Sequence, residues 1–110
     1  MLADLYGIEA ALLQDESALA ALLVTALKTA GFTILETQSH KFRGGGGGVT
    51  AIALLTESHA GFHTYPERQY MALDIFSCGQ NEPRDVLAVM AESLRPEGID
   101  FTMHERGSSA

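Results

Sequence analysis

Apolar residues recur at helical spacing in two stretches of the chain. In residues 15–30 Asp15 or Ser17 can cap the start, and Gly31 supplies the stop. A second stretch starts near residues 81–83, where proline is tolerated in the first turn, and it ends at Pro96. The two apolar stripes consist of Leu19, Leu22, Leu23, Ala26, Leu27 and Ala30, and of Val86, Leu87, Met90 and Leu94. The spacing therefore predicts two amphipathic helices.

The segments outside these helices are short apolar or β-branched runs, which predict strands. They cover residues 32–38, 49–56, 59–64, 69–77 and 99–104, and residues 2–6 can add an N-terminal edge strand. The order β-α-β-β-β-β-α-β predicts an α+β two-layer sandwich, with the helices packed on one face of an antiparallel β-sheet. Tyr6, Tyr70 and Phe76 lie within the predicted strands, and we expect them in the core.

Five consecutive glycines, Gly44 to Gly48, interrupt this pattern. Ordering such a run is costly, because glycine gives up more backbone entropy than any other residue. The run is interpreted either as a floppy hairpin loop or as a loop that closes over a ligand or brings its amides to an anion. It is not a P-loop, since no Lys-Ser/Thr pair follows the glycines.

Length and composition favour one globular domain covering residues 1–110. Hydrophobic residues make up 46% of the chain and charged residues 19%. A core of this size leaves much apolar surface uncovered, which favours a homodimer that buries one face of the sheet.

Net charge and cysteine content indicate which partners and which cellular compartment to expect. The formal net charge is −7, so nucleic acid is not an expected partner, while cationic ligands are mildly favoured. Cys78 is the only cysteine, which rules out an internal disulfide and suits a reducing compartment. No run approaches the ~20 apolar residues of a membrane span, and the N-terminus does not read as a signal peptide. We therefore expect a cytoplasmic protein without a membrane partner.

The side chains that could act in catalysis or bind a metal lie mainly in residues 56–67 and 74–79. A metal site built on His59 and His63 with Glu57 or Cys78 lacks the spacing of zinc ligands, so no metal is expected. A Cys78 nucleophile with a histidine base is possible but unspecific, because it needs only one residue of each type. The third interpretation is self-processing at Ser58.

These two segments resemble the prokaryotic S-adenosylmethionine decarboxylase proenzyme family. The family pattern is a hydrophobic strand, then Glu-Ser-His, then His-Thr-Trp-Pro-Glu, then an aspartate-led strand that ends Phe-x-Cys-Gly. Its ungapped counterparts here are Glu57-Ser58-His59, His63-Thr64-Tyr65-Pro66-Glu67 and Asp74-Ile75-Phe76-Ser77-Cys78-Gly79. The resemblance spans residues 2–107 and is densest over residues 49–79.

The resemblance implies that the chain cleaves itself between residues 57 and 58. Ser58 would attack the carbonyl of Glu57, and the peptide bond would become an ester. His63 is the candidate base for the elimination that breaks the ester, and Thr50 aligns with a family serine that assists it. Loss of ammonia would convert Ser58 into a pyruvoyl group and leave chains of residues 1–57 and 58–110.

The resemblance also implies a reaction with a small-molecule substrate. The pyruvoyl carbonyl would form a Schiff base with the substrate amine and act as the electron sink in place of pyridoxal phosphate. Cys78 would return a proton to the product, Glu67 would bind the ribose hydroxyls, and Phe42 would stack on adenine. The expected reaction converts S-adenosylmethionine to its decarboxylated form for spermidine biosynthesis.

The sequence departs from the family pattern around the expected substrate pocket. The loop between Phe42 and Val49 is longer and glycine-rich, Tyr65 replaces a tryptophan, and both ends of the chain are shorter. Glu105 and Arg106 match a family segment, although a surface ion pair explains them equally well.

These departures leave two alternatives open. Some family members decarboxylate L-ornithine or L-arginine, and a remodelled pocket could hold such a smaller cation. The chain could also be a non-catalytic regulatory partner of an active paralogue. The intact Ser58, His63 and Cys78 argue against that role, which has no chemical need for them.

Overall fold

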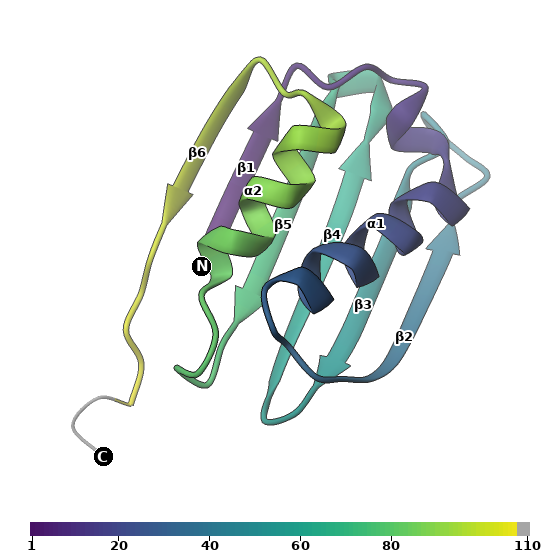
Figure 1. Cartoon of the computed structure of the whole chain (residues 1–110). Coiled ribbons are helices and arrows are strands. Elements are labelled where there is room, and N and C mark those ends of the chain that lie inside the picture. Colours follow the sequence, from purple (N-terminus) through teal and green to yellow (C-terminus); the bar gives the residue numbers. More distant parts are fainter. Residues whose placement is uncertain (108–110) are drawn as a thin grey trace.

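Two helices cover one face of a six-stranded sheet in the computed structural model, which describes residues 1–107 (Figure 1). The sheet order is β2-β3-β4-β5-β1-β6, and every neighbouring pair is antiparallel. The strands are β1 (Leu2–Tyr6), β2 (Ile34–Lys41), β3 (Val49–Leu55), β4 (Ser58–Tyr65), β5 (Tyr70–Phe76) and β6 (Gly98–Thr102). The helices are α1 (Glu16–Thr29) and α2 (Pro83–Leu94), and two 3₁₀ turns are η1 (Leu12–Gln14) and η2 (Pro66–Arg68). The predicted α+β two-layer sandwich is confirmed.

Local capping sets the ends of both helices. The Asp15 side chain accepts a hydrogen bond from the Ala18 amide at 3.1 Å and starts α1. Gly31, with φ +88°, ends it in the left-handed conformation that glycine adopts readily. Glu82 caps α2, and the helix stops before Pro96, which disfavours helical geometry in the residue ahead of it. Neither helix is long and apolar enough to cross a membrane within the described residues.

Strand β2 begins later and runs further than the predicted residues 32–38. Phe32 is only 6% exposed, and its amide donates to the Leu27 carbonyl at 2.9 Å, so it closes the end of α1 instead of starting a strand. The polar residues Ser39 and Lys41 nevertheless pair with β3. An edge strand needs backbone partners on only one side and can carry polar side chains, which explains the extension.

The two faces of the sheet differ in what covers them. Side chains that alternate along the strands form a core with α1 and α2, and include Ala3, Leu5, Ala51, Ala53, Ala60, Phe62, Leu73 and Ile75. We call the opposite face, away from both helices, the open face (Figure 1). It exposes apolar residues of the four neighbouring strands β3, β4, β5 and β1, among them Leu2, Tyr6, Ile52, Leu54, Tyr65 and Phe76.

The expectation that Tyr6, Tyr70 and Phe76 lie in the core was wrong. Tyr6 is 43% exposed and Phe76 is 38% exposed, and Tyr70 is partly exposed. All three alternate with buried neighbours, so the pleat turns them toward the open face. Bulky apolar side chains here therefore mark a second surface rather than a second part of the core.

Candidate active site

Ser58 lies directly after a strained turn between β3 and β4. Leu55 pairs with Ser58, so Thr56 and Glu57 make the two-residue connection. Glu57 has φ +55°, a left-handed conformation that costs a non-glycine residue roughly 1–2 kcal/mol. Ser58 is 8% exposed, and its hydroxyl donates to the Thr56 carbonyl at 2.9 Å. The bond between residues 57 and 58 therefore lies where the backbone stores strain.

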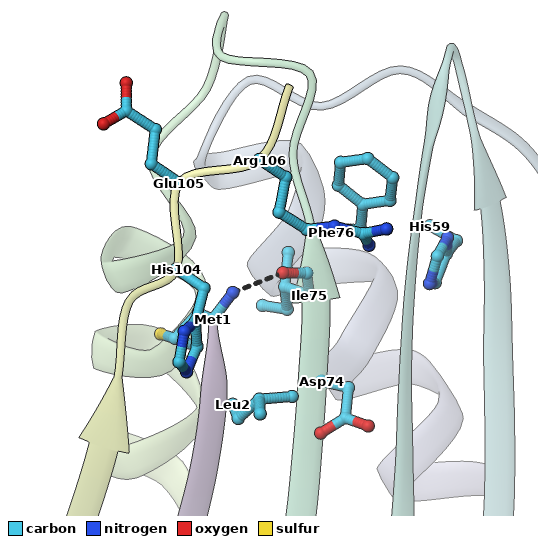
Figure 2. Close-up of a pocket in the computed structure, with 9 residues that line it drawn as sticks. All are labelled: Met1, Leu2, His59, Asp74, Ile75, Phe76, His104, Glu105 and Arg106. Carbon is cyan, nitrogen blue, oxygen red and sulfur yellow. Dashed lines mark hydrogen bonds between the residues drawn. The ribbon is translucent and has the colours of Figure 1, made fainter. Parts of the chain in front are cut away.

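A pocket of about 570 Å³ opens beside this turn on the open face (Figure 2). The Arg106 guanidinium lies 4.9 Å from the ring centroid of Phe76, and the His59 ring meets the same ring edge-on at 5.5 Å. One wall is tied down by the Met1 ammonium group, which donates to the buried Ile75 carbonyl at 2.7 Å. The lining consists of Met1, Leu2, His59, Asp74, Ile75, Phe76, His104, Glu105 and Arg106.

Residues 104–106 form part of this pocket, a role that sequence reasoning missed. The ion pair considered for Glu105 and Arg106 does not form in the part of the chain that the structure describes. Figure 2 shows the Glu105 side chain directed away from Arg106, which instead covers Phe76. Strand alternation could have found three other lining residues, because it places His59, Asp74 and Phe76 on one face.

His63 and Thr50 are paired near the other end of the sheet. They occupy directly opposite positions on β4 and β3, and the Thr50 hydroxyl lies 2.8 Å from Nδ1 of His63. Both side chains project from the open face. The contact fixes the orientation of the imidazole ring, as is needed for a base that acts on a defined proton.

Glu67 and Phe42 lie at the same end of the sheet as His63. Phe42 follows β2 and packs its exposed ring edge-on against His40 at 4.7 Å. Glu67 lies in η2, directly after β4, and its Oε2 accepts a hydrogen bond from the Gly46 amide at 3.2 Å. The glycine run thus brings an amide to an anion, as one of its two interpretations expected, and the anion is a side chain of the same protein.

An aromatic stack with a carboxylate at its base fills the open face near this end. Tyr6 and Tyr65 stack on either side of Tyr70 with centroid distances of 5.4 and 5.6 Å, and Arg68 lies 5.3 Å from the Tyr70 ring centroid. The Tyr70 hydroxyl donates to Asp4, and this hydrogen bond, with burial, raises the pKa of Tyr70 to about 12. The hydrogen bond to Asp4 therefore holds the central ring of the stack through a protonated phenol.

The two histidines of the motif share a face but not a partner. His59 and His63 both point to the open face, as their spacing predicted, and contact Phe76 and Thr50 respectively. No three His, Cys, Asp or Glu side chains within residues 1–107 are grouped so that they could hold a metal ion.

The expected site residues fall into two groups at opposite ends of the sheet. Ser58 begins β4 and the exposed Cys78 follows β5, so both lie at the end of the sheet that carries the lining residues His59 and Phe76; we call this the cleavage end. The Ser58 side chain is buried on the helix-covered side of the sheet, since it alternates with the outward His59. Thr50, His63, Glu67 and Phe42 lie near the opposite end, where β2 and β4 finish and β3 begins (Figure 1); we call this the histidine end. Five residues along a strand separate Ser58 from His63 by about 16 Å. One protomer therefore does not bring them together.

This fold and the motifs that it carries are those of a decarboxylase. The chain belongs to the S-adenosylmethionine decarboxylase family, which it matches over residues 1–107. The resemblance inferred from the motifs is confirmed.

Relatives and a solved structure agree with this placement. An S-adenosylmethionine decarboxylase proenzyme of Methanococcus maripaludis (strain C5) is 39% identical over 94% of this chain and 84% of the relative. An arginine decarboxylase proenzyme of Ignicoccus hospitalis is 37% identical over 92% of this chain and 69% of the relative. The crystal structure of the adenosylmethionine decarboxylase from Aquifex aeolicus is 33% identical, with a TM-score of 0.84 over 96% of this chain and 87% of that chain.

Proposed function

We propose that this chain is a self-cleaving, pyruvoyl-dependent decarboxylase that converts S-adenosylmethionine to its decarboxylated form for spermidine biosynthesis. Family membership supports the class of enzyme. The proposal of self-cleavage rests on the left-handed conformation of Glu57, directly before the Ser58 hydroxyl. Cleavage of the peptide bond between residues 57 and 58 would relieve this backbone strain.

Cleavage follows from the chemistry of the Ser58 hydroxyl. Attack of its oxygen on the Glu57 carbonyl carbon forms an ester and breaks the peptide C–N bond, which frees the amino group of residue 58. A base then removes the Cα proton of residue 58, and the bond between its Cβ and the ester oxygen breaks. That oxygen leaves as part of the new C-terminal carboxylate of residue 57. Water replaces the nitrogen of the resulting dehydroalanine, ammonia departs, and residue 58 becomes a pyruvoyl group at the start of the second chain.

The cleavage end suits such a group. Residue 58 adjoins the pocket through His59, and cleavage frees it from its turn to reach that space. The pyruvoyl group supplies an electron-accepting carbonyl. Cys78 carries an exposed thiol at the same end, where it can return a proton to the product carbon. That role requires reduced sulfur, so we place the protein in the cytoplasm.

We further propose that the active protein is a homodimer joined through its open faces. His63 lies about 16 Å along the strand from Ser58, too far to remove its Cα proton. A two-fold axis through the open face places the cleavage end of one protomer against the histidine end of its partner, and the reverse. The apolar side chains exposed on that face, such as Ile52 and Leu54, would be buried in the same step.

A basic amino acid is the second candidate substrate. The Asp74 carboxylate lines the pocket, where it could pair with an ammonium or guanidinium group as well as with a sulfonium (Figure 2). The relative from Ignicoccus hospitalis named as an arginine decarboxylase proenzyme makes this alternative specific. Glu67 and Phe42 favour the nucleoside, because a ribose diol and an adenine ring match a carboxylate and an aromatic face.

The decisive experiment measures carbon dioxide release from S-adenosylmethionine, ornithine, arginine and lysine side by side. We expect release from S-adenosylmethionine. The control is Cys78→Ala, which should remain cleaved but lose about 10²-fold in turnover, the range of a single general acid. Release only from an amino acid would reassign the substrate, and release from none despite complete cleavage would favour the regulatory role.

The Thr50 hydroxyl should affect the rate of cleavage. Thr50→Val keeps the shape of the side chain but removes the contact to His63, so we expect cleavage to slow by about tenfold, the worth of one hydrogen bond. Thr50→Ser should cleave at the native rate. Intact mass, followed over time after cell-free synthesis, measures both variants. Thr37→Val on β2 is the matched control, and equal rates for Thr50→Val and the native chain would remove Thr50 from the processing machinery.

A further inference from the structure

The glycine loop, residues 44–48, lies directly against the Glu67 carboxylate. The Gly46 amide donates to Oε2 of Glu67 at 3.2 Å. A methyl group built at Gly46 would lie 2.9 Å from Oε2, 3.0 Å from Cδ and 3.0 Å from the backbone nitrogen of Glu67. The side chain of Glu67 could rotate away, but its backbone nitrogen cannot, so any side chain at position 46 displaces the loop.

Gly44, in the same run, does not share this constraint. A methyl group at Gly44 would meet nothing within 4 Å. Gly44 and Gly46 both lie outside the left-handed region, so alanine is not strained by its own backbone at either position. Proximity to Glu67 therefore distinguishes Gly46 from Gly44.

The loop is held at its middle and at its base. Gln14, from η1, donates its side-chain amide to the Gly46 carbonyl at 2.9 Å, so both backbone polar groups of Gly46 are bonded to side chains. At the base, the Gly48 carbonyl accepts a hydrogen bond from the Phe42 amide at 2.8 Å, and a methyl group at Gly48 would clash with the Thr64 carbonyl oxygen. These contacts limit the freedom of the glycines and give the Gly46 amide a fixed direction.

We propose that the glycine loop is a positioning element for Glu67, with the Gly46 amide holding the carboxylate where it binds the polar end of the substrate. This rests on the proposed function, in which Glu67 is a substrate ligand. A carboxylate has about four acceptor sites, so one amide leaves room for two donors from a diol or a guanidinium group. Because those donors lie away from the reacting carbon, Gly46 governs KM and leaves kcat nearly unchanged.

The test compares Gly46→Ala with Gly44→Ala, which changes the unfolded chain in the same way. We expect Gly46→Ala to raise KM for S-adenosylmethionine by about tenfold, as expected for loss of a hydrogen bond to a charged group, with kcat within about twofold. Gly44→Ala should match the native enzyme. Native KM values for both variants, or equal changes in both, would overturn the proposal.

The Glu67→Gln background shows whether the loop acts through this carboxylate. Adding Gly46→Ala to Glu67→Gln should raise KM no further, since the two residues work as a unit. A further tenfold rise would show that the loop acts on something else and would contradict the proposal. A native KM for Glu67→Gln alone would remove Glu67 from the substrate site and the loop's role with it.

A readout without catalysis separates this proposal from the proposed function. The Gly46 amide proton resonance should differ between the native chain and Glu67→Gln, because a hydrogen bond to a charged carboxylate is stronger than one to an amide oxygen. If the native chain decarboxylates none of the four compounds, the proposed function fails and this comparison decides whether the loop positions Glu67. An amide resonance that ignores Glu67 would refute the positioning role even in an active enzyme.

Discussion

Ser58→Ala should remain one uncleaved chain and release no carbon dioxide from any substrate. Alanine has no oxygen to attack the Glu57 carbonyl, so no ester forms and the bond between residues 57 and 58 keeps its ordinary resistance to hydrolysis. The native chain should instead give two masses that correspond to residues 1–57 and 58–110. The expected effect is complete loss of activity, because the proposed pyruvoyl cofactor would be made from the residue that is removed.

The variant should fold, which makes this loss interpretable. Ser58 contributes one hydrogen bond, to the Thr56 carbonyl, worth about 1 kcal/mol. Ser39→Ala is the matched control, since the Ser39 hydroxyl donates to the exposed Glu16 side chain and the residue lies on the edge strand. It should cleave and turn over normally. A native chain that keeps a single full-length mass after prolonged incubation would refute the self-cleavage proposal.

The sequence predicted those parts of the fold that local signals determine. Asp15 and Gly31 marked the ends of the first helix to within a residue, because a side-chain cap and a left-handed stop act within one turn. The polar end of β2 gave no such signal, since Ser39 and Lys41 pair with a strand that comes later in the chain. Tyr6 and Phe76 were placed in the core because alternation separates two faces but does not say which one the helices cover.

For the candidate site too, the sequence identified residues through a local motif but did not predict how they are arranged in space. The motif named Ser58, His63 and Cys78, and the roles that the resemblance implies require Ser58 and His63 to meet at one site. Along an extended strand they are about 16 Å apart, and this follows from the strand geometry alone. Arg106 gave no local signal, because it reaches the Phe76 ring from a segment beyond β6.

Separation of the two ends predicts that inactive variants restore each other. Alone, Ser58→Ala lacks the cleaved residue at both sites of its dimer, and His63→Ala lacks the base at both. His63→Ala alone should therefore cleave at least about 10²-fold more slowly than the native chain. In a mixed dimer, the intact Ser58 of the His63→Ala chain faces the partner's His63, so one of the two sites is complete.

Co-expression of the two variants should therefore recover about a quarter of native activity, because random pairing of a two-fold dimer makes half of the dimers mixed and half of their sites intact. Intact mass adds a sharper readout, since only the chain that carries His63→Ala should be cleaved. Ser58→Ala with Cys78→Ala is the control, because both changes lie at the cleavage end and leave no complete site. Should the His63→Ala chain stay whole beside Ser58→Ala, or cleave at the native rate alone, the shared site would be wrong and His63 would have no role across the interface.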